Sequence, residues 1–226
     1  MQVGKIQPVI KWSGSKRSQA TEHVSYFPKE IDTYYEPFCG GISVGITAAI
    51  CNGKDLNINK FVFSDNDENL IELWNYIKKN PSLVADYYKD LWNISEDRSQ
   101  GDVKVMQSIY NDVRHYFNLF KKPLDFMFLN RTCFNGLVRY NSKGEFNTPF
   151  HLNRKGITPD KLEKIINEWS EIINKNDFEF KCCDFSLLTP SENDFVYIDP
   201  PYANTKGMYN DDFDNKRLFH WMNTLT

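Results

Sequence analysis

The sequence predicts an α/β protein built on a doubly wound, mostly parallel sheet. Short apolar segments read as strands at residues 33–38, 61–64 and 195–198, and a loop with helical character follows each of the first two. Strand–loop–helix units of this kind form parallel sheets with helices on both faces. Each segment also runs into an acidic residue or a glycine turn, and ligands in such sheets bind outside the carboxyl ends of the strands. We therefore expect a ligand site at that edge.

Composition excludes several classes of protein. The chain has 226 residues, of which 41% are hydrophobic and 25% charged, as in ordinary soluble globular proteins. No run approaches the roughly 18 apolar residues of a membrane span, and the N-terminus lacks a signal peptide. The five cysteines form no CxxC pair and the four histidines are scattered, so no zinc spacing is present. We expect a reduced, cytoplasmic protein with no membrane partner and no metal site.

The first strand leads into Gly40 and Gly41, and a helix is predicted to about residue 50. Glycine at a strand-to-helix turn lets the backbone approach a ligand, and a helix N-terminus favours an anion. The pattern is not GxGxxG, so a dinucleotide site is not supported, and a plain tight turn is an equal alternative.

The second strand ends at Asp65, roughly 25 residues past the glycine turn, a spacing at which an acid can bind ribose hydroxyls. Asp65 could equally cap the next helix, a role for which Asn66 and Asp67 compete. That helix carries an apolar face at 3.6-residue spacing, made by Leu70, Leu73, Trp74 and Ile77.

The third strand ends in Asp199-Pro200-Pro201-Tyr202. Two prolines fix the backbone, remove two N–H donors and favour an extended Asp199. The turn then presents a carboxylate, a carbonyl and an aromatic ring. Hydrogen-bond acceptors beside an aromatic face suit an amino group on a flat ring.

A long insertion separates the second and third strands. Helices are predicted at 81–92, 103–120 and 124–134, followed by a hairpin around 137–147 with an Asn-Ser-Lys-Gly turn. Residues 130–155 carry a net charge of +4, which predicts a surface for phosphates, although a solvated face is the alternative. We expect two domains: a catalytic domain from 1–80 and 176–226, and a target-recognition domain from 81–175.

Five ordered segments resemble a known family: PVIKWSGSK (8–16), YYEPFCGG (34–41), VFSDND (62–67), FLNRTCFNGLVRYNSKGEFNTPF (128–150) and YIDPPY (197–202). They are similar to the Dam-type, alpha-group adenine-N6 DNA methyltransferases. The stretch 122–150 is especially similar to the modification methyltransferases of the EcoRV system. Two departures are that Ser13 and Ser15 replace the family's Ala and Gly, and that Ile42 stands where a third Gly is common.

The resemblance implies a Rossmann-like methyltransferase sheet, S-adenosylmethionine as cofactor and double-stranded DNA as partner, in a restriction–modification, phage or nucleoid-associated setting. It implies these cofactor-binding residues: Trp12, Lys16, Phe38, Gly40, Asp65, Asp184 and Asp199. Catalysis would fall to Asp199, Pro200 and Tyr202. DNA binding would involve Lys11, Arg131, Asn135, Arg139, Asn141 and Lys143.

The implied chemistry agrees with the residues. If Asp199 and the Pro200 carbonyl each accept one N–H of an adenine amine, its lone pair can be aimed at a methyl donor, and a fixed carboxylate stabilises the charge that develops. Tyr202 would stack on a base flipped out of the duplex. The alternatives are a catalytically weak or inactive DNA-binding remnant, or a methyltransferase acting on RNA or on a protein amide.

The chain is expected to be incomplete as a methyltransferase. After Tyr202 the sequence has an acidic loop and one amphipathic stretch before it stops at Thr226, whereas further strands follow in the resembled family. The strand ending at Asp199 would keep an open edge, which favours pairing. We expect a truncation, a second chain that supplies the rest, or self-association along that edge.

Overall fold

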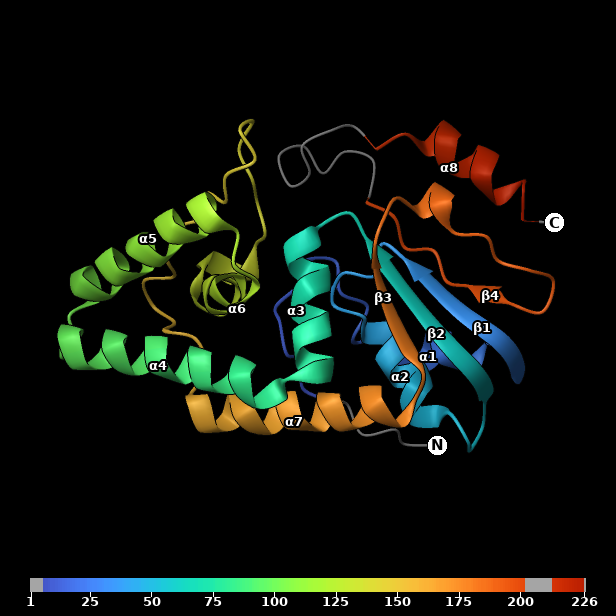
Figure 1. Cartoon of the computed structure of the whole chain (residues 1–226), viewed down its shortest axis with the longest axis horizontal. Helices are drawn as coiled ribbons and strands as arrows, with labels where there is room; N and C mark the ends of the chain where they lie inside the picture. Colours follow the sequence, from blue (N-terminus) through green and yellow to red (C-terminus); the bar gives the residue numbers. More distant parts are fainter. Residues whose placement is uncertain (1–5, 202–212, 226) are drawn as a thin grey trace.

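The computed structural model describes residues 6–201 and 213–225, so the predicted stacking residue Tyr202 lies outside the described residues. The described chain contains a four-stranded sheet of order β3-β2-β1-β4, in which every pairing is parallel (Figure 1). The strands are β1 (Glu30–Pro37), β2 (Asn57–Asp65), β3 (Phe178–Cys182) and β4 (Phe195–Val196). The predicted parallel α/β sheet is confirmed.

The strand register brings the carboxyl ends to one edge of the sheet. β1 and β2 pair from Glu30↔Asn57 to Pro37↔Ser64, and Asp65 at the end of β2 pairs with Cys182 at the end of β3. β4 pairs with β1 through two residues and forms an edge of the described sheet. The segments that leave all four strands therefore begin close together.

One face of the sheet is aromatic and covered by four helices: α1 (Ala20–Ser25), α2 (Ser43–Cys51), α3 (Glu68–Lys79) and α7 (Pro159–Lys175). Tyr34, Phe61 and Phe63 point to this face and are fully buried. Trp74 of α3 stacks on Trp169 of α7 at 5.3 Å between ring centroids. The predicted apolar face of α3 is confirmed, because its four members are all buried.

Part of the opposite face is covered by α8 (Asn215–Met222). Val62 of β2 packs there with Leu218 and Trp221 of that helix. Beyond α8 the same face carries an ion pair between Lys60 and Glu179, 2.7 Å apart. Helices therefore lie on both faces, as expected for a doubly wound sheet.

The inserted region begins with three helices, α4 (Pro81–Ser99), α5 (Val103–Phe120) and α6 (Pro123–Thr132), which Figure 1 places on the far side of α3 from the sheet. The three helices are confirmed, although α4 runs to Ser99 instead of Trp92. The predicted hairpin is a turn joined by an isolated Tyr140↔Phe146 bridge, not a pair of described strands. Its Asn141 side-chain oxygen accepts from the N–H groups of Lys143 and Glu145, and two backbone hydrogen bonds, from Asn141 to Glu145 and from Asn147 to Arg139, pair its two arms.

β3 and α7 are among the elements that were missed from the sequence, as is the short helix α1. β3 makes the count of strands four instead of three. Its inward Phe178 and Phe180 alternate with Glu179 and Lys181 on the charged face. The helix α7 before it contacts α2 and α3 as well as α4, so it lies against both the sheet region and the insertion. The boundaries 81–175 of the inserted domain stay a prediction.

None of the helices in the described ranges is long and apolar enough to cross a membrane.

Candidate functional site

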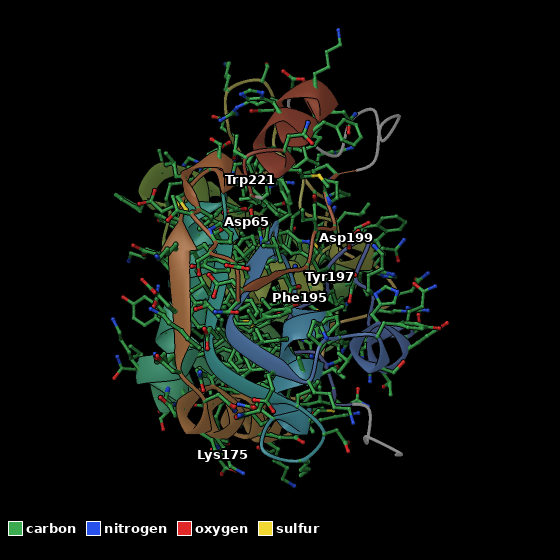
Figure 2. The ribbon with its side chains drawn as sticks, turned by 90° about the vertical axis from the view of Figure 1, so that its right-hand side faces the viewer. Asp65, Lys175, Phe195, Tyr197, Asp199 and Trp221 are labelled. Carbon is green, nitrogen blue, oxygen red and sulfur yellow. The ribbon has the colours of Figure 1, made fainter. Side chains whose placement is uncertain are left out.

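A cavity of about 500 Å³ lies at the carboxyl ends of the strands. Figure 2 shows Asp65 and Asp199 toward the end of the sheet that carries Trp221, with Lys175 at the opposite end. The cavity walls come from the segment before α1, from the loops that leave all four strands, and from the start of α8. The residues that line the cavity include Trp12, Lys16, Glu36, Phe38, Gly40, Asp65, Asp184, Phe185, Asp199, Phe213 and Arg217.

The glycine turn after β1 is a site of close packing. Gly40 has φ +46°, and a Cβ atom built on it would lie 2.3 Å from the indole nitrogen of Trp12. The Gly40 carbonyl accepts a hydrogen bond from the Trp74 indole at 3.0 Å. Glycine is required here because the Trp12 ring lies against the turn and leaves no room for a Cβ atom. The structure therefore brings Trp12 and Gly40, two predicted cofactor residues, together.

Asp65 lines the cavity and is not the cap of α3. Its Oδ2 accepts from the Gly40 N–H at 3.1 Å, and its Oδ1 accepts from the Asp67 N–H at 3.1 Å. Asp67 is the residue that caps α3. Burial raises the pKa of Asp65 to about 6, and its backbone hydrogen bonds oppose this rise.

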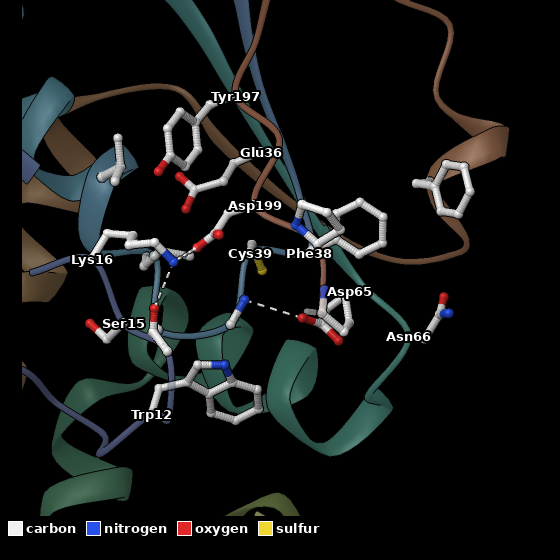
Figure 3. Close-up of a pocket in the computed structure, with 18 of the residues that line it drawn as sticks. Trp12, Ser15, Lys16, Glu36, Phe38, Cys39, Asp65, Asn66, Tyr197 and Asp199 are labelled. Atoms are coloured by element: carbon white, nitrogen blue, oxygen red, sulfur yellow. Dashed lines mark hydrogen bonds and ion pairs between the residues drawn. The ribbon is translucent and has the colours of Figure 1, made fainter. Parts of the chain in front are cut away.

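At the other end of the cavity, Lys16 reaches Asp199 (Figure 3). The Lys16 ammonium donates to Asp199 Oδ2 at 2.5 Å and to the Gly14 carbonyl at 3.1 Å. Both side chains are mostly buried, with 17% and 25% of their surface exposed. The structure thus joins a predicted cofactor residue to the predicted catalytic carboxylate.

Glu36 is a second acid in this part of the cavity, and the sequence prediction gave it no role. Its Oε2 accepts from the Tyr34 hydroxyl at 2.8 Å and from the Gly45 N–H at 2.9 Å. Burial raises the pKa of Glu36 to about 8, so the carboxyl is mostly protonated at neutral pH. The sequence feature that could have pointed to Glu36 is its position directly before the turn at Pro37 and Phe38.

Aromatic rings form the wall next to Asp65. The Phe38 ring lies 5.2 Å from Phe185 and 5.3 Å from Phe213 between centroids. Phe185 and Phe213 were not predicted, although Phe185 directly follows Asp184. Such a wall offers stacking surface for a flat ring.

Asp184 is held by this chain's own donors. Its carboxylate accepts from the Ser186 N–H and hydroxyl, and from both terminal nitrogens of Arg217, at 2.6 and 3.1 Å. Burial raises the pKa of Asp184, but the Ser186 hydrogen bonds and the Arg217 charge outweigh it and lower the pKa overall. The Arg217 guanidinium also lies 5.1 Å from the centre of the Phe185 ring. No sequence signal pointed to Arg217.

Two of the predicted DNA-binding residues are withdrawn from the surface to different degrees: Lys11 is half-buried and Arg131 is buried. The Lys11 ammonium donates to the Arg131 carbonyl at 3.1 Å, and burial and the Arg131 charge lower the pKa of Lys11. Arg131 is 5% exposed, and burial lowers its pKa to about 10. Arg131 thus lacks the open surface that the sequence prediction assumed, because α6 packs in the interior of the insertion. Its role in DNA binding stays a prediction.

The other predicted DNA-binding residues lie on or beside the turn at residues 137–147, called the projecting turn below. Arg139, Lys143 and Asn135 are exposed, and Asn135 adopts a left-handed backbone conformation with φ +54°. The Arg139 Nε donates to the Asn147 side chain at 2.7 Å. Asn141 stabilises the turn from within, as described above. The exposed basic residues are accessible to a large ligand.

Comparison with known proteins agrees with this geometry. Residues 12–225 match the family model described as D12 class N6 adenine-specific DNA methyltransferase. The chain is 30% identical to the Type II methyltransferase M.FokI of Planomicrobium okeanokoites, over 91% of this chain and 30% of that protein. It is 31% identical to the DNA adenine methylase of Haemophilus influenzae, over 88% of this chain and 65% of that protein.

A third relative is the Type II methyltransferase M.MjaIII of Methanocaldococcus jannaschii, which is 30% identical over 95% of this chain and 78% of that protein. The chain thus spans 30% of M.FokI and 65% of the Haemophilus influenzae protein. The predicted resemblance to Dam-type enzymes is confirmed. This chain belongs to the D12 class of N6 adenine-specific DNA methyltransferases.

Proposed function

We propose that this protein transfers a methyl group from S-adenosylmethionine to the N6 amine of an adenine in duplex DNA. The observation that carries the proposal is the position of Asp199. This carboxylate follows β4, precedes two prolines, and lines the same cavity as Phe38 and Asp65. A hydrogen-bond acceptor for an amine and a site for a flat, ribose-bearing cofactor therefore share one cavity.

The cavity suits this cofactor in size and chemistry. A volume of about 500 Å³ falls within the range of roughly 300–1,000 Å³ for small-molecule sites. The wall of Phe38, Phe185 and Phe213 suits an adenine ring, and Asp65 supplies carboxylate oxygens for ribose hydroxyls. When bound, the cofactor supplies an electrophilic methyl group on a sulfonium.

The residues of this chain would orient the amine. Asp199 and the Pro200 carbonyl are fixed acceptors that hold its two N–H groups, and proline keeps the backbone rigid. The carboxylate stabilises the positive charge that grows on nitrogen. Fixed groups of this kind lower an activation barrier by about 3–4 kcal/mol. Tyr202 stays a predicted stacking residue outside the described residues.

Duplex DNA is the proposed substrate because the insertion places exposed cations on a projecting turn. Arg139 and Lys143 suit phosphates or guanine edges, and the exposed Asn135 would contact a base edge. Restriction–modification and a cytoplasmic, nucleoid-associated location go with this substrate. β4 forms an edge of the sheet in the described residues, and a second chain or a second copy would pair there.

The direct test is incubation of the full chain with methyl-labelled S-adenosylmethionine and duplex DNA of mixed sequence, followed by mapping of the modified base. N6-methyladenine at a defined sequence is the expected product. RNA and a glutamine-containing peptide serve as competing substrates, and Asp199→Ala is the control. Label in RNA or peptide but not in DNA would overturn the proposal, as would cofactor and DNA binding with no transfer.

A further inference from the structure

A hydrogen bond joins the projecting turn to the cofactor edge of the sheet. The Tyr140 hydroxyl donates to Asp67 Oδ2 at 2.9 Å, across 73 positions of sequence. Tyr140 lies between Arg139 and Asn141, two residues predicted to contact DNA. Asp67 lies in the loop after β2, two residues beyond Asp65. The bond therefore connects two regions with different proposed ligands.

Tyr140 is fixed to the turn by packing as well as by backbone pairing. It pairs with Phe146 across the base of the turn, and the two rings meet edge to face at 5.9 Å. The Lys121 ammonium lies 5.9 Å from the Tyr140 ring and donates to the Gly144 carbonyl of the same turn. A displacement of the turn would therefore carry the Tyr140 hydroxyl with it.

Asp67 continues the connection toward the cavity. Its Oδ1 caps α3 by accepting from the Asn69 and Leu70 N–H groups, at 3.0 and 3.3 Å. Its own N–H donates to Asp65 Oδ1 at 3.1 Å, and Asp65 Oδ2 accepts from Gly40. Three hydrogen bonds thus run without interruption from Tyr140 through Asp67 and Asp65 to the glycine turn.

The electrostatics of the loop make the phenol donor important. Asp65 and Asp67 are neighbouring acids, and the charge of Asp67 contributes to the raised pKa of Asp65. Burial raises the pKa of Asp67, while the Tyr140 hydrogen bond opposes this rise. Burial also raises the pKa of Tyr140, which keeps its hydroxyl protonated as a donor. Without that donor, the Asp67 carboxylate would keep its Asn69 and Leu70 donors but would lose its link to the turn.

We propose that Tyr140 is a positioning residue that acts through Asp67 and Asp65, so that contact of the turn with DNA strengthens binding of the cofactor. The inference rests on the proposed function and goes beyond it, because it names the connection between the two binding regions. Coupling of this kind is reciprocal: the cofactor strengthens DNA binding by the same factor.

The test is Tyr140→Phe, which removes the hydroxyl and keeps the ring. Affinity for sinefungin, a cofactor analogue, is measured by calorimetry without DNA and with a saturating short duplex carrying the mapped adenine site. For the wild-type protein we expect DNA to tighten sinefungin binding by at least about fivefold, the lower end of typical coupling. For Tyr140→Phe we expect a ratio close to one.

Tyr87→Phe is the matched control, because the Tyr87 hydroxyl also donates to a carboxylate, that of Asp125, at 2.5 Å but within the insertion. It should keep the wild-type ratio. Asp67→Ser removes the acceptor of the same hydrogen bond, since serine still caps a helix but is too short to reach Tyr140. It should lose the coupling, and the double variant Asp67→Ser with Tyr140→Phe should lose no more.

A wild-type ratio in Tyr140→Phe, or an equal loss in Tyr87→Phe, would overturn the inference. So would a ratio of one in the wild-type protein, which leaves the proposed function intact provided that both ligands bind. A wild-type protein that binds neither sinefungin nor the duplex would overturn the proposed function and this inference together.

Discussion

The ammonium of Lys16 lies 2.5 Å from the Asp199 carboxylate, although 183 positions separate the two residues. The ion pair lies in a cavity that also contains Glu36, whose raised pKa leaves it mostly neutral. Lys16 therefore supplies a positive charge beside the Asp199 carboxylate. The family resemblance implied cofactor binding by Lys16 and did not include this ion pair.

Lys16→Met should slow methyl transfer more than it weakens cofactor binding. Without the ammonium, Asp199 loses an ion-pair partner, and we expect single-turnover rates to fall by about tenfold to a hundredfold. Lys16→Arg keeps the cation and should lose less. If Lys16→Met changed sinefungin affinity and left the rate unchanged, Lys16 would be a cofactor ligand alone.

Asp199→Ala should lower turnover by at least roughly a hundredfold, the scale for losing one fixed electrostatic group at a reacting centre. Its affinity for sinefungin should stay within about tenfold of the wild-type value, because Phe38 and Asp65 still line the rest of the cavity. Rapid-quench transfer and calorimetry measure the two quantities. If the Asp199→Ala variant kept more than about a tenth of the wild-type turnover, the assignment of Asp199 would be contradicted.

Arg217→Ala should weaken sinefungin binding by about three- to tenfold and leave DNA affinity unchanged. The pair with Asp184 tethers α8, but the Arg217 side chain is 51% exposed, so solvent screens the interaction and the effect is modest. Arg217→Lys should be intermediate, since lysine lacks the two-pronged geometry of arginine. Equal losses of sinefungin and DNA affinity would instead indicate a general loss of folding.

Glu36→Gln should flatten the pH dependence of stability. The Glu36 carboxyl has a pKa of about 8 in the folded protein against an ordinary value of 4.5. Between these values the unfolded chain binds fewer protons than the folded one, so the free energy of unfolding falls as the pH rises, by at most about 1.4 kcal/mol per pH unit. Glutamine does not titrate, and its oxygen can still accept from Tyr34 and Gly45.

Urea unfolding of both proteins at a series of pH values measures this difference. Above about pH 8 the Gln variant should be the more stable, and below about pH 4.5 the two should converge. A parallel pH dependence in the two proteins would show that Glu36 is ionised in the folded state.

Arg139→Ala and Lys143→Ala should each weaken DNA binding and lower the slope of log affinity against log salt by about one, if each contacts one phosphate. Fluorescence anisotropy on a labelled duplex measures the slope. Lys175→Ala is the control, because Lys175 is exposed at the end of the sheet opposite Asp199 (Figure 2). Unchanged slopes in both test variants would place DNA elsewhere on the protein.

The sequence by itself determined the strand ends and the chemistry they carry. An apolar run followed by an acid can be recognised from the sequence alone, because the strand residues are buried and the residue after them faces solvent or a ligand. Asp65, Asp199 and the apolar face of α3 were found in this way. β3 was missed because Phe178 and Phe180 alternate with the charged Glu179 and Lys181, so it lacks the continuous apolar run by which the other strands were predicted.

The tertiary structure alone decided which of these residues act together. Lys16 with Asp199, Asp184 with Arg217 and Tyr140 with Asp67 are separated by 183, 33 and 73 positions. It also decided that Arg131, a predicted surface cation, is buried. Local propensity and periodicity describe neighbours along the chain, whereas these pairs form because the parallel register brings the strand ends to one edge and the insertion folds back beside them.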